Sequence, residues 1–166
     1  MEYYKTIFIY NSNYIYAAWY DEDENEMEGF LNENKHILYF SSEKELEDHC
    51  KNKELTLRDD YVVTVNLDEV LAKSNEENLI VDCNYILNLW NLFIDVAYTT
   101  GIPFYGKDRE TLSVNERLFH GTNMPILQAM RGTDRLYIPK WSKKDIKIIK
   151  KVLKDCYNLF KKSYEK

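Results

Sequence analysis

The longest apolar segment of the chain spans residues 82–101. Its apolar side chains cover most of a helical cylinder, whereas its polar ones recur every three or four residues: Asn84, Asn88, Asn91, Asp95 and Thr99. This periodicity predicts a helix that is apolar on nearly all sides and is therefore wrapped by other elements. Asp82 can cap its start, and Gly101 followed by Pro103 can end it. The segment is too polar, and its unbroken apolar stretches are too short, to cross a membrane, which takes ~20 nearly unbroken apolar residues.

Strand patterns dominate the first half of the chain. Residues 4–10 and 14–20 are rich in Ile, Tyr and Phe, and Asn11-Ser12-Asn13 between them is a turn signal. They predict an antiparallel hairpin. Residues 36–40 and 61–65 predict two further strands, the second from its β-branched side chains.

Helical patterns dominate the second half. Besides the central segment, the predicted helices span residues 43–52, 66–72, 111–119, 124–130 and 142–163. Ser42 with Glu45, and Ser142 with Asp145, have the spacing of capping boxes. For residues 136–138 we expect either a short strand or an extended segment. The order indicates an α+β fold, with an N-terminal antiparallel sheet of three to four strands packed against C-terminal helices around a central buried helix (82–101).

Length and composition indicate one ordered domain over residues 1–166. Aromatic residues are abundant, with 14 Tyr, 7 Phe and 3 Trp, whereas glycine and proline are scarce. Cys50, Cys83 and Cys156 form no CxxC pair, and their odd number indicates reduced thiols in a cytoplasmic protein. The first ten residues begin with an acid and lack a basic flank before a long apolar run, so we expect no signal peptide.

The net charge of −6 is unevenly distributed. Residues 1–78 carry 19 acidic and 7 basic side chains, whereas residues 79–166 carry 9 and 15. Most of the positive excess lies in the last predicted helix, where lysines surround an apolar stripe, as is typical of a solvated amphipathic helix rather than a nucleic-acid or membrane-binding one. The acidic first half argues against a nucleic-acid partner, because phosphates would repel it, and suits a basic protein.

The sequence contains no recognisable motif for catalysis, cofactor binding or metal binding. His36, His49 and His120 share no ligand spacing, and no cysteine lies in a nucleophile motif. The glycines form no phosphate-binding loop. We therefore expect no cofactor, no metal and no enzymatic activity.

The densest charge lies in residues 21–28, where six of eight positions are acidic. This run could be a solvated loop or strand edge, a catalytic or metal site using Asp21, Asp23 and Glu26, or the contact for a basic partner. Its spacing has no geometric specificity, so a solvated surface is the default. If the run binds a partner, the contact residues would be six acids and an aromatic anchor: Asp21, Glu22, Asp23, Glu24, Glu26, Glu28, and Tyr16 or Tyr20.

Two arrangements are open for the polar stripe of the central segment. It either faces water, which is the commoner case, or forms a buried network that fixes the packing. Asp95 lies between apolar neighbours and would need a cationic partner, for which Arg117 is a candidate.

Four segments carry a further pattern: ILYFSSEKEL (37–46), LNLWNLFIDVAYTTGIPF (87–104), ERLFHGTNMPIL (116–127) and YIPKWSKKDIKIIKKVL (137–153). They contain a Trp-Asn pair, a Leu-Phe helix end, a glycine-asparagine turn with a proline, and an Ile-Pro-x-Trp step: Trp90-Asn91, Leu118-Phe119, Gly121 to Asn123, Pro125, and Ile138 to Trp141. Together these segments resemble a group of small bacterial immunity proteins. Such proteins protect a cell from the toxin domains of contact-dependent growth inhibition and related polymorphic toxin systems. The motifs are structural, so they transfer no binding residue.

The resemblance and the charge together predict an immunity protein that binds a cognate toxin, a basic nuclease domain, and occludes its active site. We expect a cytoplasmic monomer in a 1:1 complex, with no nucleic-acid or membrane partner. Charge complementarity would raise the association rate constant to as much as ~10⁸–10⁹ M⁻¹s⁻¹. The alternatives are a small hydrolase or metal-dependent enzyme, using the acidic run or His120 near Asn123, and an adaptor for another basic protein.

Overall fold

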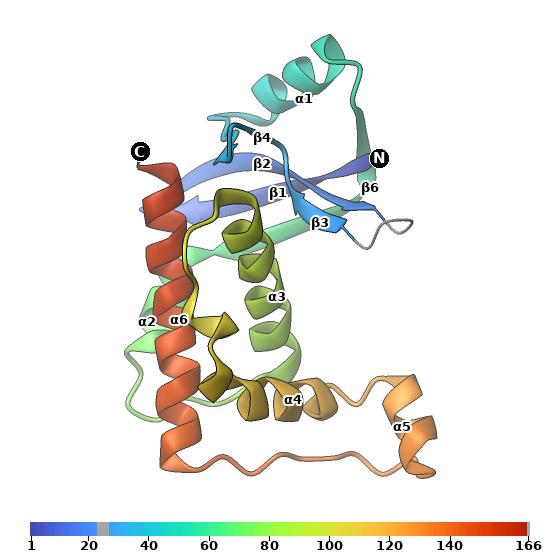
Figure 1. The fold of residues 1–166 in the computed structure, drawn as a ribbon, viewed down its shortest axis with the longest axis vertical. Helices are drawn as coiled ribbons and strands as arrows, with labels where there is room; N and C mark the ends of the chain where they lie inside the picture. The colour runs from blue at the N-terminus through green and yellow to red at the C-terminus, as the bar shows by residue number, and fades with distance from the viewer. Residues whose placement is uncertain (23–26, 166) are drawn as a thin grey trace.

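The computed structural model describes residues 1–22 and 27–165. Its strands are β1 (Glu2–Tyr10), β2 (Asn13–Glu22), β3 (Met27–Phe30), β4 (Asn32–Glu33), β5 (His36–Ile37) and β6 (Thr56–Asn66). Its α-helices are α1 (Glu43–Asn52), α2 (Leu67–Ser74), α3 (Cys83–Thr100), α4 (Leu112–Gly121), α5 (Pro125–Arg131) and α6 (Lys143–Tyr164). Two short 3₁₀ turns, η1 (Tyr105–Lys107) and η2 (Arg109–Thr111), connect α3 to α4. The sheet comes first and most helices follow, which confirms the α+β class (Figure 1).

Within the described residues, four strands form the main sheet, in the order β3-β2-β1-β6. The predicted hairpin is confirmed, because β1 and β2 pair antiparallel from Glu2 opposite Asp21 to Tyr10 opposite Asn13. The sheet is antiparallel from β3 to β1, and its last strand, β6, pairs parallel with β1. The parallel pairing arises because α1 returns the chain to the end of the sheet where β1 begins, as crossover helices do.

The strand predicted over residues 36–40 is shorter than expected. β5 covers only His36–Ile37 and pairs with β4 in a separate ribbon. Phe40 then makes an isolated bridge to Tyr16, with each backbone N–H donating to the other residue's carbonyl at 2.8 and 2.9 Å. The segment therefore covers a stretch of the β2 edge that β3 does not pair with.

The central helix is confirmed as α3. The Asp82 side chain accepts a hydrogen bond from the Tyr85 N–H at its start, and Gly101 ends it in the left-handed region at φ 71°. The helix packs against α4, α6 and the edge strand β3 (Figure 1). The Phe93 ring is fully buried, with the rings of Phe8 and Phe104 both 6.4 Å away between centroids.

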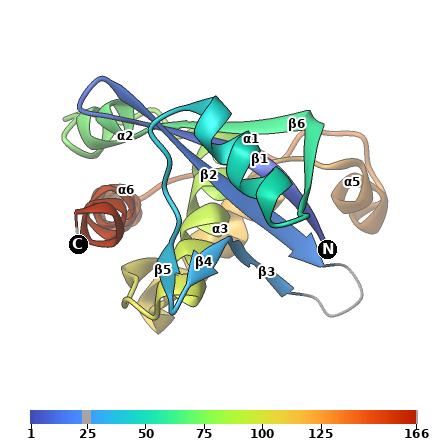
Figure 2. The ribbon, with the colours of Figure 1, turned by 90° about the horizontal axis from the view of Figure 1, so that it is seen from above.

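The two faces of the sheet are covered differently (Figure 2). α3 and α6 cover the face of the larger core, whereas α1 covers the other face with a small cluster: Tyr3, Ala18, Leu46 and Cys50. Successive residues of a strand point to opposite faces. Trp19 therefore packs on the core that contains α3, whereas Tyr16 and Tyr20 pack on the α1 side.

The capping box at the start of α6 is confirmed. Ser142 Oγ accepts from the Asp145 N–H, and the Asp145 carboxylate accepts from the Ser142 N–H. The same carboxylate accepts two hydrogen bonds from the Arg117 guanidinium, at 2.7 and 2.8 Å. The predicted pairing of Arg117 with Asp95 is therefore wrong, because α4 brings Arg117 to the start of α6, whereas Asp95 lies in the second half of α3.

The described helices include none with the length and apolar character needed to cross a membrane.

Candidate functional site: an acidic cleft between the sheet and the central helix

The described part of the acidic run lies at the edge of the sheet. Asp21 and Glu22 end β2, and Glu28 lies in β3 directly opposite Asp21. Because β3 is an edge strand, these side chains occupy a strand edge, which is one of the expected alternatives. Three of the predicted contact residues lie outside the described residues: Asp23, Glu24 and Glu26.

Of the two tyrosines predicted as anchors, Tyr20 lies close to the acids. It packs edge-on against Tyr3 with ring centroids 5.8 Å apart, and burial raises the pKa of its hydroxyl. A Cβ added at Gly29 would come within 2.8 Å of the Tyr20 hydroxyl and 3.0 Å of Thr99 Oγ1. Glycine at this position therefore allows the edge strand to pass close to both side chains.

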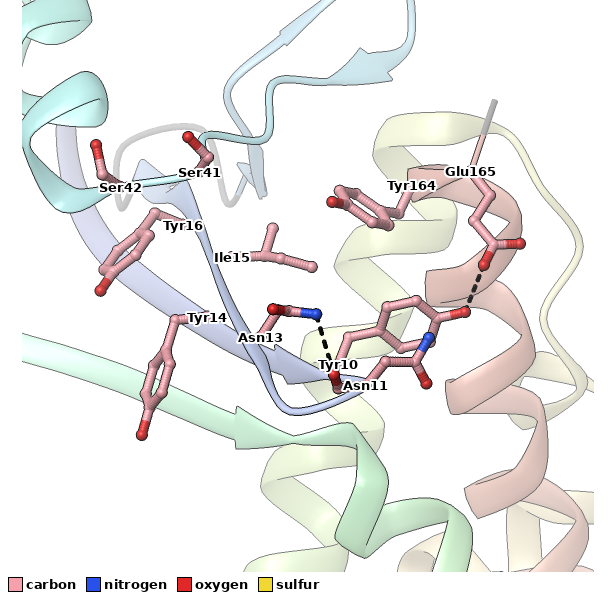
Figure 3. Close-up of a pocket in the computed structure, with 10 residues that line it drawn as sticks. All are labelled: Tyr10, Asn11, Asn13, Tyr14, Ile15, Tyr16, Ser41, Ser42, Tyr164 and Glu165. Atoms are coloured by element: carbon pink, nitrogen blue, oxygen red, sulfur yellow. Dashed lines mark hydrogen bonds between the residues drawn. The ribbon is translucent and has the colours of Figure 1, made fainter.

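Tyr16 lies apart from the acids. It is five residues from Asp21 on β2, or ~17 Å along the strand. It lines a separate hollow of about 680 Å³ between the β1–β2 turn, the start of α1 and the end of α6 (Figure 3). In this hollow the Tyr10 hydroxyl donates to Glu165 at 2.6 Å. The structure therefore does not place Tyr16 with the acidic run.

A smaller hollow, of about 240 Å³, lies between the sheet and α3. The sheet contributes Trp19, Glu28, Tyr61 and Val63, and α3 contributes Asn88, Asn91, Leu92 and Asp95. We call this hollow the acidic cleft. Apart from Glu28, the site predictions did not include these residues. The available signal was the polar stripe of the central segment, since its period places Asn88, Asn91 and Asp95 on one face of the helix.

The polar stripe is divided between the two arrangements that the sequence left open. Asn84, Asn88 and Asn91 are exposed, whereas Asp95 and Thr99 are each 7 % exposed. The Thr99 hydroxyl accepts from the Phe30 N–H at 3.0 Å, and the Asp95 carboxylate accepts from Trp19. The second half of the stripe therefore ties α3 to β2 and to the end of β3.

A β-bulge places Tyr61 at the cleft. The register between β1 and β6 shifts after Tyr4, so that residues 59–61 have no partner in β1. Such bulges bend a strand and re-aim its side chains. The Tyr61 ring lies 6.2 Å from that of Tyr4, which lies 5.7 Å from that of Trp19. The three aromatic rings therefore form a row across β6, β1 and β2.

Asp95 is the buried acid of the cleft. Its Oδ2 accepts from Trp19 Nε1 at 2.9 Å, whereas its other oxygen has no hydrogen-bond partner within residues 1–22 and 27–165. Burial raises the pKa of Asp95 to about 7 against the Trp19 hydrogen bond, which lowers it, and the negative charges of Glu28 and Asp21 raise it further. Burial and Asp21 likewise raise the pKa of Glu28.

The acids around the cleft have no counter-charge in the part of the chain that the structure describes. Asp21, Glu22, Glu28 and Asp95 form no ion pair there with a lysine or arginine. A nearby cation would favour the ionised carboxylates and reverse the upward shifts of their pKa values. The cleft is thus electrostatically suited to a cationic group.

Replacing Asp95 by asparagine is expected to stabilise the free protein at pH 8. The pKa of about 7 lies above the ordinary 3.8, so the native state holds a proton that the unfolded chain releases. Ionisation of Asp95 therefore leaves the free energy of unfolding unchanged below about pH 4 and lowers it by the full amount above about pH 7. The difference between the two pKa values corresponds to ~4 kcal/mol. We expect asparagine to raise the free energy of unfolding by about 2 kcal/mol, because water in the open cleft screens the charge. Asparagine keeps an acceptor for Trp19.

Urea unfolding at pH 5 and pH 8 measures this effect. The gain over the unsubstituted protein should be larger at pH 8 than at pH 5, and the exposed control Asp134→Asn should show neither gain. An Asp95→Asn variant that is destabilised equally at both values would contradict the electrostatic description of the cleft.

The histidines and cysteines do not gather into a second site. Within the described residues, no group of three or more His, Cys, Asp or Glu is placed to hold a metal. The three cysteines are free thiols. His120 is exposed beside Tyr137, and the Asn123 amide is engaged with the Tyr137 backbone, donating at 2.9 Å and accepting at 2.7 Å.

A second surface was not anticipated from the sequence. Residues 122–141, which we call the arm, leave the body after α4, form α5 and return to α6 (Figure 1). Residues 136–138 are extended and unpaired within the described chain, which is one of the two alternatives expected. The arm exposes several large apolar side chains: Met124, Ile126, Met130, Leu136, Tyr137 and Ile138. Apolar surface of this kind is typical of interaction sites.

The acidic cleft combines residues from strands β2, β3 and β6 with residues from α3. Its carboxylates can accept hydrogen bonds from a cation, and its aromatic rings can pack on a flat cationic group. Its chemistry is therefore that of a binding site for positive charge. In comparisons with protein-family models, with curated proteins and with solved structures, nothing matched the chain.

Proposed function

We propose that the chain is a bacterial immunity protein that binds a cognate toxin domain with a basic surface and neutralises it by occluding the active site. The observation that carries this proposal is the acidic cleft, where Glu28 and Asp95 lie near Asp21 without a cation among the described residues. The resemblance of the four sequence segments to small immunity proteins supports the same class. The complex would be 1:1 and would form in the cytoplasm.

A nuclease domain suits this surface because it must hold phosphate groups, and it does so with lysine and arginine. Carboxylates of the chain can bind those lysine and arginine side chains in place of the phosphate groups and so exclude the substrate. Complementary charges also accelerate encounter and disfavour the wrong partners. The neutralising protein needs no chemistry of its own for this task.

The charge-neutralised triple variant Asp21→Asn, Glu22→Gln and Glu28→Gln tests the proposed contact. Its association rate constant with the toxin encoded by the neighbouring gene should fall about tenfold at low salt, and the salt dependence of that rate should flatten. Stopped-flow fluorescence at several salt concentrations measures both. The matched control is Glu76→Gln, Glu77→Gln and Asp134→Asn, which removes the same charge at exposed positions outside the cleft. Equal rates for both triple variants would place the contact elsewhere.

Co-purification with the product of the neighbouring gene separates the three classes of function. A toxin that is recovered in a 1:1 complex and loses its activity supports the immunity protein. A basic partner without toxic activity supports an adaptor instead. Turnover of a substrate by the chain alone, abolished by replacing Asp21 or His120, would support the enzyme and overturn the proposal.

A further inference from the structure

We infer that the acidic cleft receives one arginine side chain of the protein partner, with its guanidinium between Asp95 and Glu28 and its stem against Trp19 and Tyr61. This inference rests on the proposed function, since it names the group of the basic partner that enters the site. It assigns the cleft as the specific anchor point within a broader contact between charged surfaces.

The size of the cleft fits one long side chain. Its volume of about 240 Å³ lies below the ~300–1,000 Å³ of pockets that hold a drug-sized ligand. The space is too small for a helix or strand of the partner. One wall is already held in place, because Trp19 donates a hydrogen bond to Asp95. Binding therefore costs no ordering of these two side chains.

The second oxygen of Asp95 is available to a donor that enters the cleft. Asp95 is only 7 % exposed and lines the cleft, yet only one of its oxygens has a hydrogen-bond donor among the described residues. A buried carboxylate is stabilised in its charged form by a cation and by further hydrogen bonds. A donor that enters the cleft would complete this site, and Glu28 at the rim would provide a second carboxylate.

The remaining walls favour guanidinium over ammonium. Guanidinium is planar, carries five donors in a fixed arrangement and packs on aromatic faces. The cleft offers the rings of Trp19 and Tyr61, and the side-chain oxygens of Asn88 and Asn91 as further acceptors. An ammonium is smaller and more strongly hydrated, with three donors, so it would leave more of these groups unused.

Titration with N-acetyl-arginine amide, followed by nuclear magnetic resonance, tests the inference on the intact chain. The chain has three tryptophans, so three indole N–H signals can be followed, and Trp19→Phe assigns the one in the cleft. Trp90, which is 1 % exposed and donates to the Gly106 carbonyl, is the internal reference. The Trp19 signal should shift saturably with the arginine amide while the Trp90 signal stays fixed.

Two analogues identify the group that is recognised. N-acetyl-citrulline amide has nearly the same shape without the charge, and it should cause no saturable shift. N-acetyl-lysine amide should bind about tenfold more weakly than the arginine amide, because it cannot form the planar contacts. Equal shifts with arginine and citrulline, or equal affinities for arginine and lysine, would overturn the inference.

Variants locate the site. Asp95→Asn should raise the dissociation constant of the arginine amide at least about tenfold, because it removes the charge and keeps an acceptor for Trp19. Glu28→Gln should raise it about threefold, since Glu28 lies at the exposed rim. Asp134→Asn should leave it unchanged. An Asp95→Asn variant with an unchanged Trp90 signal and full affinity for arginine would overturn the assignment.

The two proposals can fail separately. The titration contains no toxin, so arginine binding without a toxin partner would retain the cleft and remove the immunity function. Conversely, a toxin complex with charge-dependent association in which Asp95→Asn has no effect, and no arginine binding by the free protein, would retain the function and remove the cleft as its anchor.

Discussion

Replacing Phe93 by alanine is expected to lower the free energy of unfolding by about 4 kcal/mol, the cost of removing a large ring from a closed core. Phe93 is fully buried in α3 and lies between Phe8 of β1 and Phe104 of the loop that follows the helix. Because these neighbours belong to different elements, they cannot move together to fill the cavity. Urea unfolding at neutral pH measures the loss.

Tyr98→Ala is the matched control for this prediction. It removes an aromatic ring from the same helix, but Tyr98 is 59 % exposed, so we expect a change within about 0.5 kcal/mol. Phe93→Leu should fall between the two variants. If the alanine variants at 93 and 98 were equally stable, α3 would not be the centre of the core.

Asp145→Ala is expected to lower the free energy of unfolding by about 3 kcal/mol. About 1 kcal/mol comes from the carboxylate half of the capping box, because the Ser142 N–H loses its acceptor. The rest comes from the ion pair, because alanine removes the two hydrogen bonds that the Arg117 guanidinium donates to the carboxylate. The loss is smaller than for a fully buried pair, because the Arg117 side chain is 30 % exposed and water can reach it.

The same site has a defined pH dependence. The Arg117 hydrogen bonds hold the pKa of Asp145 well below its usual range. A depressed pKa contributes stability that is complete above the ordinary value of the carboxyl group and is lost only as the pH falls through the folded value. The difference between the wild type and Asp145→Ala should therefore persist at pH 5 and shrink in strong acid. Glu116→Gln, next to Arg117 but exposed, should change little at any pH.

Asp95 and Asp145 have opposite effects on the stability of the folded protein. Asp145 is paired with Arg117 and strengthens the junction of α4 with α6, so its pKa falls. Asp95 is buried with two other carboxylates nearby, so its pKa rises and its charge works against the folded state. A residue that lowers the stability of the free protein is better explained by a role in binding than by packing.

The local features of the fold could be predicted from the sequence. The start and end of α3 follow from Asp82 and Gly101, and the start of α6 follows from Ser142 and Asp145. The β1–β2 turn follows from Asn11-Ser12-Asn13, where Asn11 and Ser12 take positive φ angles of 49° and 62°. Each feature depends on residues a few positions apart, whose interactions are set by helical or strand geometry.

The composition of the candidate site could not be predicted in the same way. Asp95 bonds to Trp19, 76 residues away in the sequence, and no local pattern specifies that contact. The acidic run identified Asp21 and Glu28, but Tyr16 belongs to another hollow, and Tyr61 reaches the cleft only through a β-bulge.

By itself, the sequence determined the helices, the hairpin, the caps and the excess of acid in the first half of the chain. Only the tertiary structure decided that β6 lies parallel to β1, that Asp95 bonds to Trp19 rather than Arg117, and that Glu28 and Asp95 line one cleft. The physical reason is that hydrophobic periodicity specifies which face of an element is buried, without specifying its neighbour. Which faces meet depends on how all the elements pack together.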